Sequence, residues 1–131
     1  NICMVGTGYV GLVAGACLAD FGMEYLLFEA GLVELIHKNA QAKRLHFATE
    51  IREAVERALV IFIAVGTPPR ADGSPDLSFI FQVAEAISEH MNGYKVVVTK
   101  STVPTGTGAQ IEEILRKNPG GHKFSVVSNP E

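Results

Sequence analysis

The sequence predicts an α/β domain built on a doubly wound parallel sheet of about six strands. Apolar, strand-like runs alternate with helix-like segments along the chain, an order typical of parallel sheets with right-handed crossovers. The run at residues 59–65 is apolar at every position, as expected of a central strand covered on both faces. Polar segments rich in Gly and Pro follow the strands, at the edge where such sheets bind ligands. The length of 131 residues suggests one domain, 1–131.

Each element has a local signal. The strands are predicted at residues 2–5, 24–29, 45–48, 59–65, 95–99 and 124–128. The helices are predicted at residues 10–21, 32–39, 50–57, 77–91 and 105–117. Gly22 ends the first helix, Thr49 caps the third, and Asp76 caps the fourth. One stripe of the fourth helix is expected to face the core, and it consists of Phe79, Ile80, Val83, Ala84 and Ile87. Two halves of this kind predict the strand order 3-2-1-4-5-6.

A glycine-rich turn follows the first strand directly. It reads Gly6, Thr7, Gly8, Tyr9, Val10 and Gly11, and it opens the first helix. Gly6 allows the sharp turn, Gly8 lets the backbone approach a pyrophosphate, and Gly11 lets the helix pack closely on the strand. The free N–H groups and the dipole at the helix start attract phosphates. The turn therefore predicts a dinucleotide site of the Rossmann type, and the alternative is a glycine turn in some other βα unit.

Bulk properties disfavour several other classes. The net charge of −3 gives no basic surface for nucleic acid or for an anionic membrane. No apolar run approaches the roughly 20 residues of a membrane span, and the first residues do not read as a signal peptide. Cys3 and Cys17 are expected to be buried, and small buried thiols fit a reducing cytoplasm. The four histidines lack metal-ligand spacing, so no metal site is predicted.

Four stretches resemble the signatures of the UDP-glucose/GDP-mannose dehydrogenases and come in that family's order. They are residues 6–13, residues 65–78, residues 100–107 and residues 128–131. The resemblance covers nearly the whole chain. It implies a Rossmann domain that binds NAD, in an enzyme that oxidises the primary alcohol of a nucleotide sugar to a carboxylate with two NAD+. It also implies that a cysteine carries thiohemiacetal and thioester intermediates.

The resemblance implies roles for individual residues as well. The glycine turn holds the pyrophosphate, and the nicotinamide side is lined by Gly66, Thr67 and Pro68. Ser101 and Thr102 approach the nicotinamide ribose and the reacting centre. Thr102 is implied to position a catalytic water, and Glu131 to act as an acid/base or to orient that water, because thioester hydrolysis needs water held and deprotonated.

The chain departs from the family pattern in two ways. Relatives continue through a linking helix into a second domain that binds the nucleotide sugar and carries the nucleophilic cysteine, so the chain alone is expected to be inactive. Because family members assemble through that linking helix, the resemblance implies that the parent enzyme is a homo-oligomer. Cys3 and Cys17 belong to the first βα unit and cannot replace that cysteine. About twenty residues of the family pattern are missing near residues 25–30. Glu29 is therefore either the acid that binds the adenosine ribose, about twenty residues after the turn, or part of a later loop, in which case that acid is absent.

Other functions remain open from the sequence. Another two-domain NAD enzyme, such as a hydroxyacid or 6-phosphogluconate-type dehydrogenase, shares the first turn but not the later stretches. A nucleotide-binding module without catalysis is a second possibility, and a methyltransferase is disfavoured by the full three-glycine pattern. Within the family, the nucleotide sugar is either UDP-glucose, or GDP-mannose or another sugar of the same kind.

Overall fold

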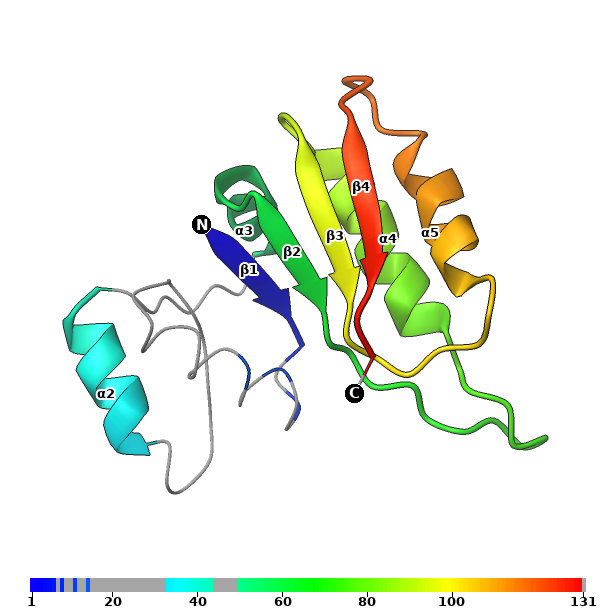
Figure 1. Cartoon of the computed structure of the whole chain (residues 1–131), viewed down its shortest axis with the longest axis horizontal. Coiled ribbons are helices and arrows are strands. Elements are labelled where there is room, and N and C mark those ends of the chain that lie inside the picture. The colour runs from blue at the N-terminus through cyan, green and yellow to red at the C-terminus, as the bar shows by residue number, and fades with distance from the viewer. Residues whose placement is uncertain (7, 9–10, 12–13, 15–32, 44–49, 131) are drawn as a thin grey trace.

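A computed structural model describes residues 1–6, 8, 11, 14, 33–43 and 50–130. In that part of the chain, strands and helices alternate around one parallel sheet (Figure 1). In chain order the elements are β1 (Ile2–Val5), α2 (Val33–Gln41), α3 (Ile51–Arg57), β2 (Val60–Ile63), α4 (Ser78–His90), β3 (Lys95–Thr99), α5 (Thr107–Leu115) and β4 (Phe124–Ser128). No helix in these ranges is long and apolar enough to cross a membrane.

The described strands lie side by side in the order β1-β2-β3-β4, and every neighbouring pair is parallel. They correspond to the first, fourth, fifth and sixth predicted strands, so this order is the 1-4-5-6 part of the predicted arrangement. The α/β class is therefore confirmed. The predicted strands at 24–29 and 45–48, and most of the helix at 10–21, lie outside the described residues. Since the strands are parallel, their carboxyl ends all lie at the same edge of the sheet (Figure 1).

The core lies between the sheet and the helices α3, α4 and α5. Ile61 and Ile63 of β2 are fully buried on this side, whereas Val60 and Phe62 are only partly buried. The alternation follows from the pleat of the strand. The prediction of a seven-residue strand covered on both faces is wrong in two respects. β2 has four residues, and only every second one is buried. The largest fully buried apolar side chains are Val55, Ile61, Ile63, Ile80, Ile87, Val97, Ile111 and Leu115, each worth roughly 1.5–3 kcal/mol of burial.

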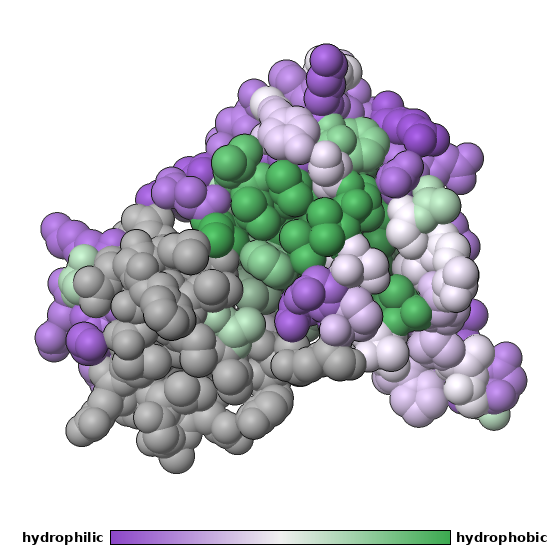
Figure 2. Space-filling view, viewed as in Figure 1, coloured by the Kyte–Doolittle hydropathy of each residue, from purple (hydrophilic) through white to green (hydrophobic). Residues whose placement is uncertain are grey.

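The face of the sheet turned away from these helices is also apolar. Figure 2 shows hydrophobic residues gathered over the sheet, with polar residues around them. Because side chains alternate between the two faces of a pleated strand, this face carries Val60, Phe62 and Val96. Val127 of β4 is 43% exposed. Two apolar faces are typical of a parallel sheet that is covered on both sides.

The buried stripe of α4 is narrower than predicted. Ile80, Ala84 and Ile87 are completely buried, but Phe79 is 49% exposed. Val83 is partly buried. The prediction that Phe79 belongs to the core is wrong, because helical spacing identifies the apolar side of a helix without fixing where the core ends. Phe79 and Val83 lie on the neighbouring side of the helix.

The start of α4 differs slightly from the prediction. The N-cap residue is Leu77, and the first helical residue is Ser78. Asp76 nevertheless accepts the Ser78 N–H at 3.0 Å, and its carboxylate lies 3.1 Å from Arg70 Nη2. Asp76 therefore stabilises the start of α4 from the position before the N-cap residue. At α3, the N-cap residue is Glu50 without a side-chain bond, and the predicted cap Thr49 lies outside the described residues.

Candidate cofactor site

The turn after β1 packs directly against the end of β2. Gly6 has a φ of +117°, a conformation that favours glycine. A Cβ atom at Gly6 would lie 2.5 Å from the carbonyl oxygen of Ala64, and a Cβ atom at Gly11 would collide with the carbonyl oxygen of Gly6. The packing of the chain itself therefore requires glycine at both positions.

Gly8 and Gly66 are glycines of a different kind. A Cβ atom at either position would meet nothing within 4 Å. Both residues border the same cavity, so a side chain there would occupy space beside the bare backbone. Without a side chain at these positions a ligand can come close to the backbone, which is what close approach to a phosphate requires.

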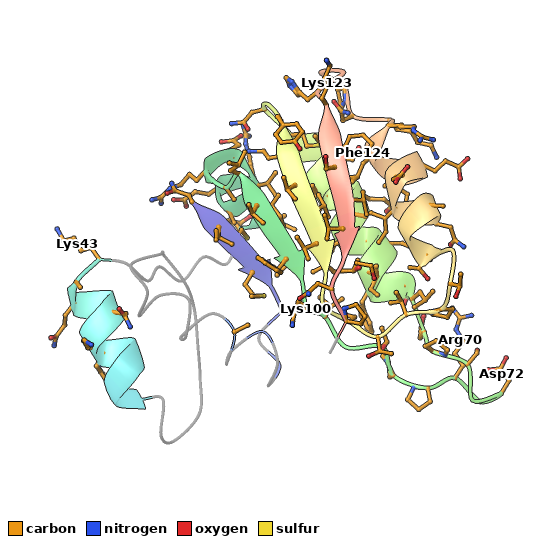
Figure 3. All side chains as sticks on the ribbon, viewed as in Figure 1. Lys43, Arg70, Asp72, Lys100, Lys123 and Phe124 are labelled. Atoms are coloured by element: carbon orange, nitrogen blue, oxygen red, sulfur yellow. The ribbon has the colours of Figure 1, made fainter. Side chains whose placement is uncertain are left out.

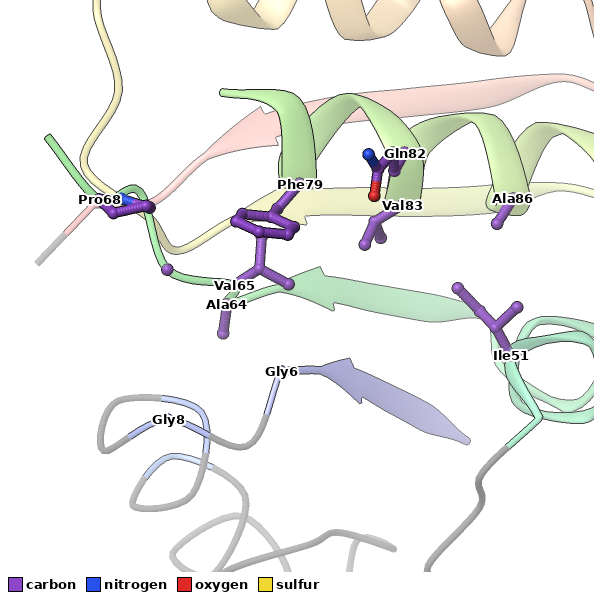
Figure 4. A pocket seen from close by; sticks show the side chains of 11 residues that line it. Gly6, Gly8, Ile51, Ala64, Val65, Pro68, Phe79, Gln82, Val83 and Ala86 are labelled. Atoms are coloured by element: carbon purple, nitrogen blue, oxygen red, sulfur yellow. The ribbon is translucent and has the colours of Figure 1, made fainter. Parts of the chain in front are cut away.

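This cavity has a volume of about 450 Å³ and lies between the ends of β1 and β2 and the helix α4 (Figure 4). The strand ends contribute Gly6, Gly8, Ala64, Val65, Gly66 and Pro68. The helices contribute Ile51, Phe79, Gln82, Val83 and Ala86. Phe79 reaches the cavity from α4 and Val65 from the end of β2 (Figure 4). Apart from the Gln82 amide the side chains are apolar, as in sites that hold an aromatic ring with few polar contacts.

Sequence reasoning did not identify the contribution of α4 to this cavity. Phe79, Gln82, Val83 and Ala86 occupy positions i, i+3, i+4 and i+7 and so share one side of the helix. This spacing is the sequence signal for a second face of the helix. It does not stand out in the sequence, because this stripe directly adjoins the core stripe and the two merge into one largely apolar pattern.

Backbone hydrogen bonds between neighbouring segments continue past the carboxyl ends of the strands. We call this edge of the sheet, with Ala64, Lys100 and Asn129 as its first residues, the ledge. Three bonds continue the ladder one residue beyond the strands: Ala64 N–H to Val5 O at 2.8 Å, Lys100 N–H to Ile63 O at 2.9 Å, and Asn129 N–H to Thr99 O at 2.9 Å. The residues that follow each strand are thereby held in fixed positions relative to one another.

Side chains on this ledge link neighbouring loops. The Ser101 hydroxyl donates a 2.7 Å hydrogen bond to the carbonyl oxygen of Val65. Lys100, labelled in Figure 3, places its Nζ 3.4 Å from Asn129 Oδ1. The structure therefore brings the segments after β2, β3 and β4 together at one edge. Thr102 is exposed beside Ser101.

The segment between β2 and α4 folds back on itself (Figure 3). The N–H of Asp76 donates to the carbonyl oxygen of Pro68 at 2.8 Å. Asp72 accepts the hydroxyl and the N–H of Ser74 at 2.6 and 2.9 Å, and these two bonds hold the pKa of the Asp72 carboxyl below its usual value. The hairpin therefore fixes the path from Pro68 to α4.

The predicted site residues are only partly within the described chain. Gly66 and Pro68 border the cavity, whereas Thr67 between them does not. The remaining predicted residues, Thr7, Tyr9, Val10, Glu29 and Glu131, lie outside the described residues.

The described residues include neither a metal centre nor an activated cysteine. No group of His, Cys, Asp and Glu among them could hold a metal ion. Cys3 packs against the core, and burial raises the pKa of its thiol to about 11. At neutral pH it is therefore a protonated thiol, which is a poor nucleophile. Cys17 lies outside the described residues.

A strand, a tight glycine turn, a following helix start and a cavity at the carboxyl edge of a parallel sheet define a dinucleotide-binding domain. The open glycines and the apolar cavity fit the pyrophosphate and a flat ring of such a ligand. The chain belongs to the UDP-glucose/GDP-mannose dehydrogenase family, and the model of that family's NAD binding domain matches residues 23–131. The resemblance seen in the sequence is thereby confirmed, and NAD is the cofactor of this type of domain.

The most similar relatives include two bacterial enzymes. The UDP-glucose 6-dehydrogenase TuaD of Bacillus subtilis (strain 168) is 42% identical, and the match covers 100% of this chain and 32% of TuaD. The UDP-glucose 6-dehydrogenase of Rhizobium meliloti (strain 1021) is 43% identical, with 100% and 34% covered. The chain thus spans about a third of the length of these relatives.

Two solved structures have the same fold. A UDP-glucose dehydrogenase from the archaeon Pyrobaculum islandicum superposes with a TM-score of 0.89 at 35% identity, covering 99% of this chain and 35% of that one. A GDP-mannose dehydrogenase from Pseudomonas aeruginosa superposes with a TM-score of 0.90 at 30% identity, covering 99% and 36%. Both similarities extend over almost all of this chain.

The relatives also carry residues that this chain lacks. The matches to TuaD and to the Rhizobium enzyme each span 150 positions, against the 131 residues of this chain, which leaves 19 positions without a counterpart. The family match begins at residue 23 and so leaves out the glycine turn. Both observations agree with a segment missing after the turn, and its location near residues 25–30 remains a prediction.

Proposed function

We propose that this chain binds NAD+ as the cofactor domain of a nucleotide-sugar dehydrogenase. The observation that carries the proposal is the cavity bordered by Gly8 and Gly66, where open glycine backbone meets apolar walls. Backbone N–H groups suit a pyrophosphate, and the apolar walls suit an aromatic ring. Among the described residues, no charged side chain borders the cavity, so in this proposal the phosphates depend on the backbone and on the helix start.

In this proposal the binding residues form two groups. The pyrophosphate group consists of Gly6, Thr7, Gly8, Tyr9, Val10 and Gly11. The nicotinamide group consists of Gly66, Thr67, Pro68, Ser101 and Thr102. When bound, NAD+ accepts the hydride removed from the substrate, while this chain orients it and keeps water away. Thr102 and Glu131 hold the water that hydrolyses the enzyme-bound thioester, and Glu29 binds the adenosine ribose only if it is the acid that follows the turn.

The proposed substrate of the whole protein is UDP-glucose, which is oxidised to UDP-glucuronate with two NAD+. The names of the two relatives at 42% and 43% identity support this choice. GDP-mannose, or another nucleotide sugar, is the second candidate, because a GDP-mannose dehydrogenase superposes over 99% of the chain. A nucleotide-binding module without catalysis is the third.

Catalysis is proposed to require the part of the relatives that this chain does not span. Cys3 does not supply the nucleophile, since it is partly buried against the core and burial raises the pKa of its thiol to about 11. The relatives' remaining two thirds would therefore bring the nucleotide-sugar site and the catalytic cysteine. Assembly of the parent enzyme into a homo-oligomer and its location in the cytoplasm are parts of the same proposal.

Calorimetric titration of the chain with NAD+ and with NADP+ tests the binding step. We expect NAD+ to bind and UDP-glucose alone to bind much more weakly. A steady-state assay with UDP-glucose and NAD+ is expected to show no NADH from this chain, whereas the full-length protein produces it. The same assay with GDP-mannose separates the two substrates, and a full-length protein that binds NAD+ without turnover of either would favour the module.

A further inference from the structure

We propose that Ser101, besides its place in the nicotinamide group, acts on the cofactor site through the peptide between Val65 and Gly66, as a positioning residue. The inference rests on the proposed function, because it assigns Ser101 a task in NAD+ binding. The Ser101 hydroxyl donates a 2.7 Å hydrogen bond to the carbonyl oxygen of Val65. A serine hydroxyl has one proton, so the donor capacity of this side chain is already used within the chain.

The bond fixes the direction of the neighbouring N–H group. In a trans peptide the C=O and N–H groups point in opposite directions, and the described chain has no cis peptide. With the Val65 carbonyl turned toward Ser101, the Gly66 N–H points away from Ser101. β1 and β3 lie on opposite sides of β2, and Gly6 and Gly8, which follow β1, border the cavity, so we infer that an N–H pointing away from Ser101 faces the cavity side. This N–H has no acceptor among the described residues, which leaves it available to a ligand.

Glycine at position 66 makes such a restraint necessary. A residue without Cβ allows the peptide on its N-terminal side to rotate more freely, and no atom lies within 4 Å of where a Cβ would be. A rotated peptide would present the Val65 carbonyl oxygen to the cavity in place of the N–H. A carbonyl oxygen repels a phosphate or another electron-rich ligand atom, whereas a preset N–H stabilises it without reorganisation.

The surroundings keep the Ser101 hydroxyl in place. The N–H of the preceding residue, Lys100, is bonded to Ile63 O at 2.9 Å, which ties the start of this loop to the end of β2. Ser101 and Val65 are both partly buried. Val65 and Phe79 both line the cavity (Figure 4). The bond is therefore partly sheltered from competing water.

The test compares the wild-type chain with Ser101→Ala and Ser101→Thr. NAD+ affinity is measured by calorimetry, and the amide signals of Gly66 and Gly8 are followed by ¹⁵N NMR during the titration. We expect Ser101→Ala to bind NAD+ about 5- to 20-fold more weakly, the effect of losing one hydrogen bond, and Ser101→Thr to stay within about twofold. NAD+ should shift the Gly66 signal in the wild type but not in Ser101→Ala, while the Gly8 signal shifts in both.

Ser88→Ala is the matched control. Ser88 also donates its hydroxyl to a backbone carbonyl, Ile114 O at 3.1 Å, but between α4 and α5 and away from the ledge. Its loss should lower stability and leave NAD+ affinity unchanged. Unchanged affinity in Ser101→Ala, or a weaker affinity with the Gly66 shift retained, overturns the inference alone. A wild-type chain that binds no NAD+ overturns the proposed function, and the inference with it.

Discussion

Lys95 Nζ donates a 2.6 Å hydrogen bond to the carbonyl oxygen of Ala58, directly after α3. A longer bond of 3.4 Å reaches the carbonyl oxygen of Glu56. Lys95 is 4% exposed, and burial lowers the pKa of its ammonium group, while the Glu56 carboxylate opposes this change. A cation at the C-terminal end of a helix is favoured by the helix dipole. The contact holds α3 against β3, and α3 carries Ile51 to the cavity wall.

Replacing this lysine should therefore destabilise the domain. Lys95→Met removes both bonds and leaves the Ala58 carbonyl without this donor, while the Glu56 carbonyl keeps its 3.0 Å bond from Asn92 Nδ2. We therefore expect a loss of about 1–3 kcal/mol in urea unfolding. Lys117 lies just beyond α5 and is exposed, so Lys117→Met serves as the control with little expected change. Equal losses of unfolding free energy in the two variants would show that the Lys95 hydrogen bonds do not contribute to stability.

The partly buried thiol of Cys3 predicts a specific dependence of stability on pH. Its pKa is about 11 in the folded chain and near 9.0 when unfolded. Because the folded state favours the protonated thiol, this contribution is complete below pH 9 and is lost as the pH rises toward 11. We expect unfolding free energy to fall by about 2 kcal/mol more in the wild type than in Cys3→Ala over that interval. Parallel pH curves for the two proteins would contradict the assignment.

The two kinds of glycine should separate stability from binding. Gly6→Ala places a methyl group 2.5 Å from the Ala64 carbonyl oxygen at a positive φ, so we expect a loss of at least 2 kcal/mol, estimated from strain of about 1–3 kcal/mol plus the clash. Gly8→Ala meets no atom and should keep the wild-type melting temperature within about 2 °C, yet weaken NAD+ binding at least about tenfold by crowding the phosphates. Normal NAD+ binding by Gly8→Ala would contradict the proposal that the cofactor's phosphates lie at Gly8.

Filling the cavity should weaken cofactor binding without disturbing the core. Ala86 is on the cavity side of α4, whereas Glu85 beside it is exposed. We expect Ala86→Phe to lower NAD+ affinity at least about tenfold, because the added ring takes space that the cofactor's own ring would use. Glu85→Phe introduces the same side chain outside the cavity and should bind normally. Circular dichroism of both variants checks that α4 is retained.

The sequence predicted the sheet, the glycine turn and the edge at which the loops meet, because these follow from local patterns. The position of the α4 stripes did not follow, since Phe79 and Ile80 are equally apolar and only the packing separates one from the other. Ser101 was placed at the right edge by its motif. Its bond to Val65 depends on how β2 and β3 align, a relationship between segments 36 residues apart that no local pattern contains.

The 19 positions that the relatives have and this chain lacks lead to the last prediction. In dinucleotide-binding domains an acidic residue after the second strand accepts hydrogen bonds from the adenosine ribose hydroxyls and favours NAD over NADP. If that acid lies in the missing segment, Glu29→Gln should leave NAD+ affinity unchanged. Inserting the corresponding TuaD segment should then tighten NAD+ binding at least about tenfold, the effect of charge-assisted hydrogen bonds, and increase the preference over NADP+. Calorimetry with both cofactors measures each change. A strong loss in Glu29→Gln would instead identify Glu29 as the ribose acid, and the inserted segment would then add no affinity.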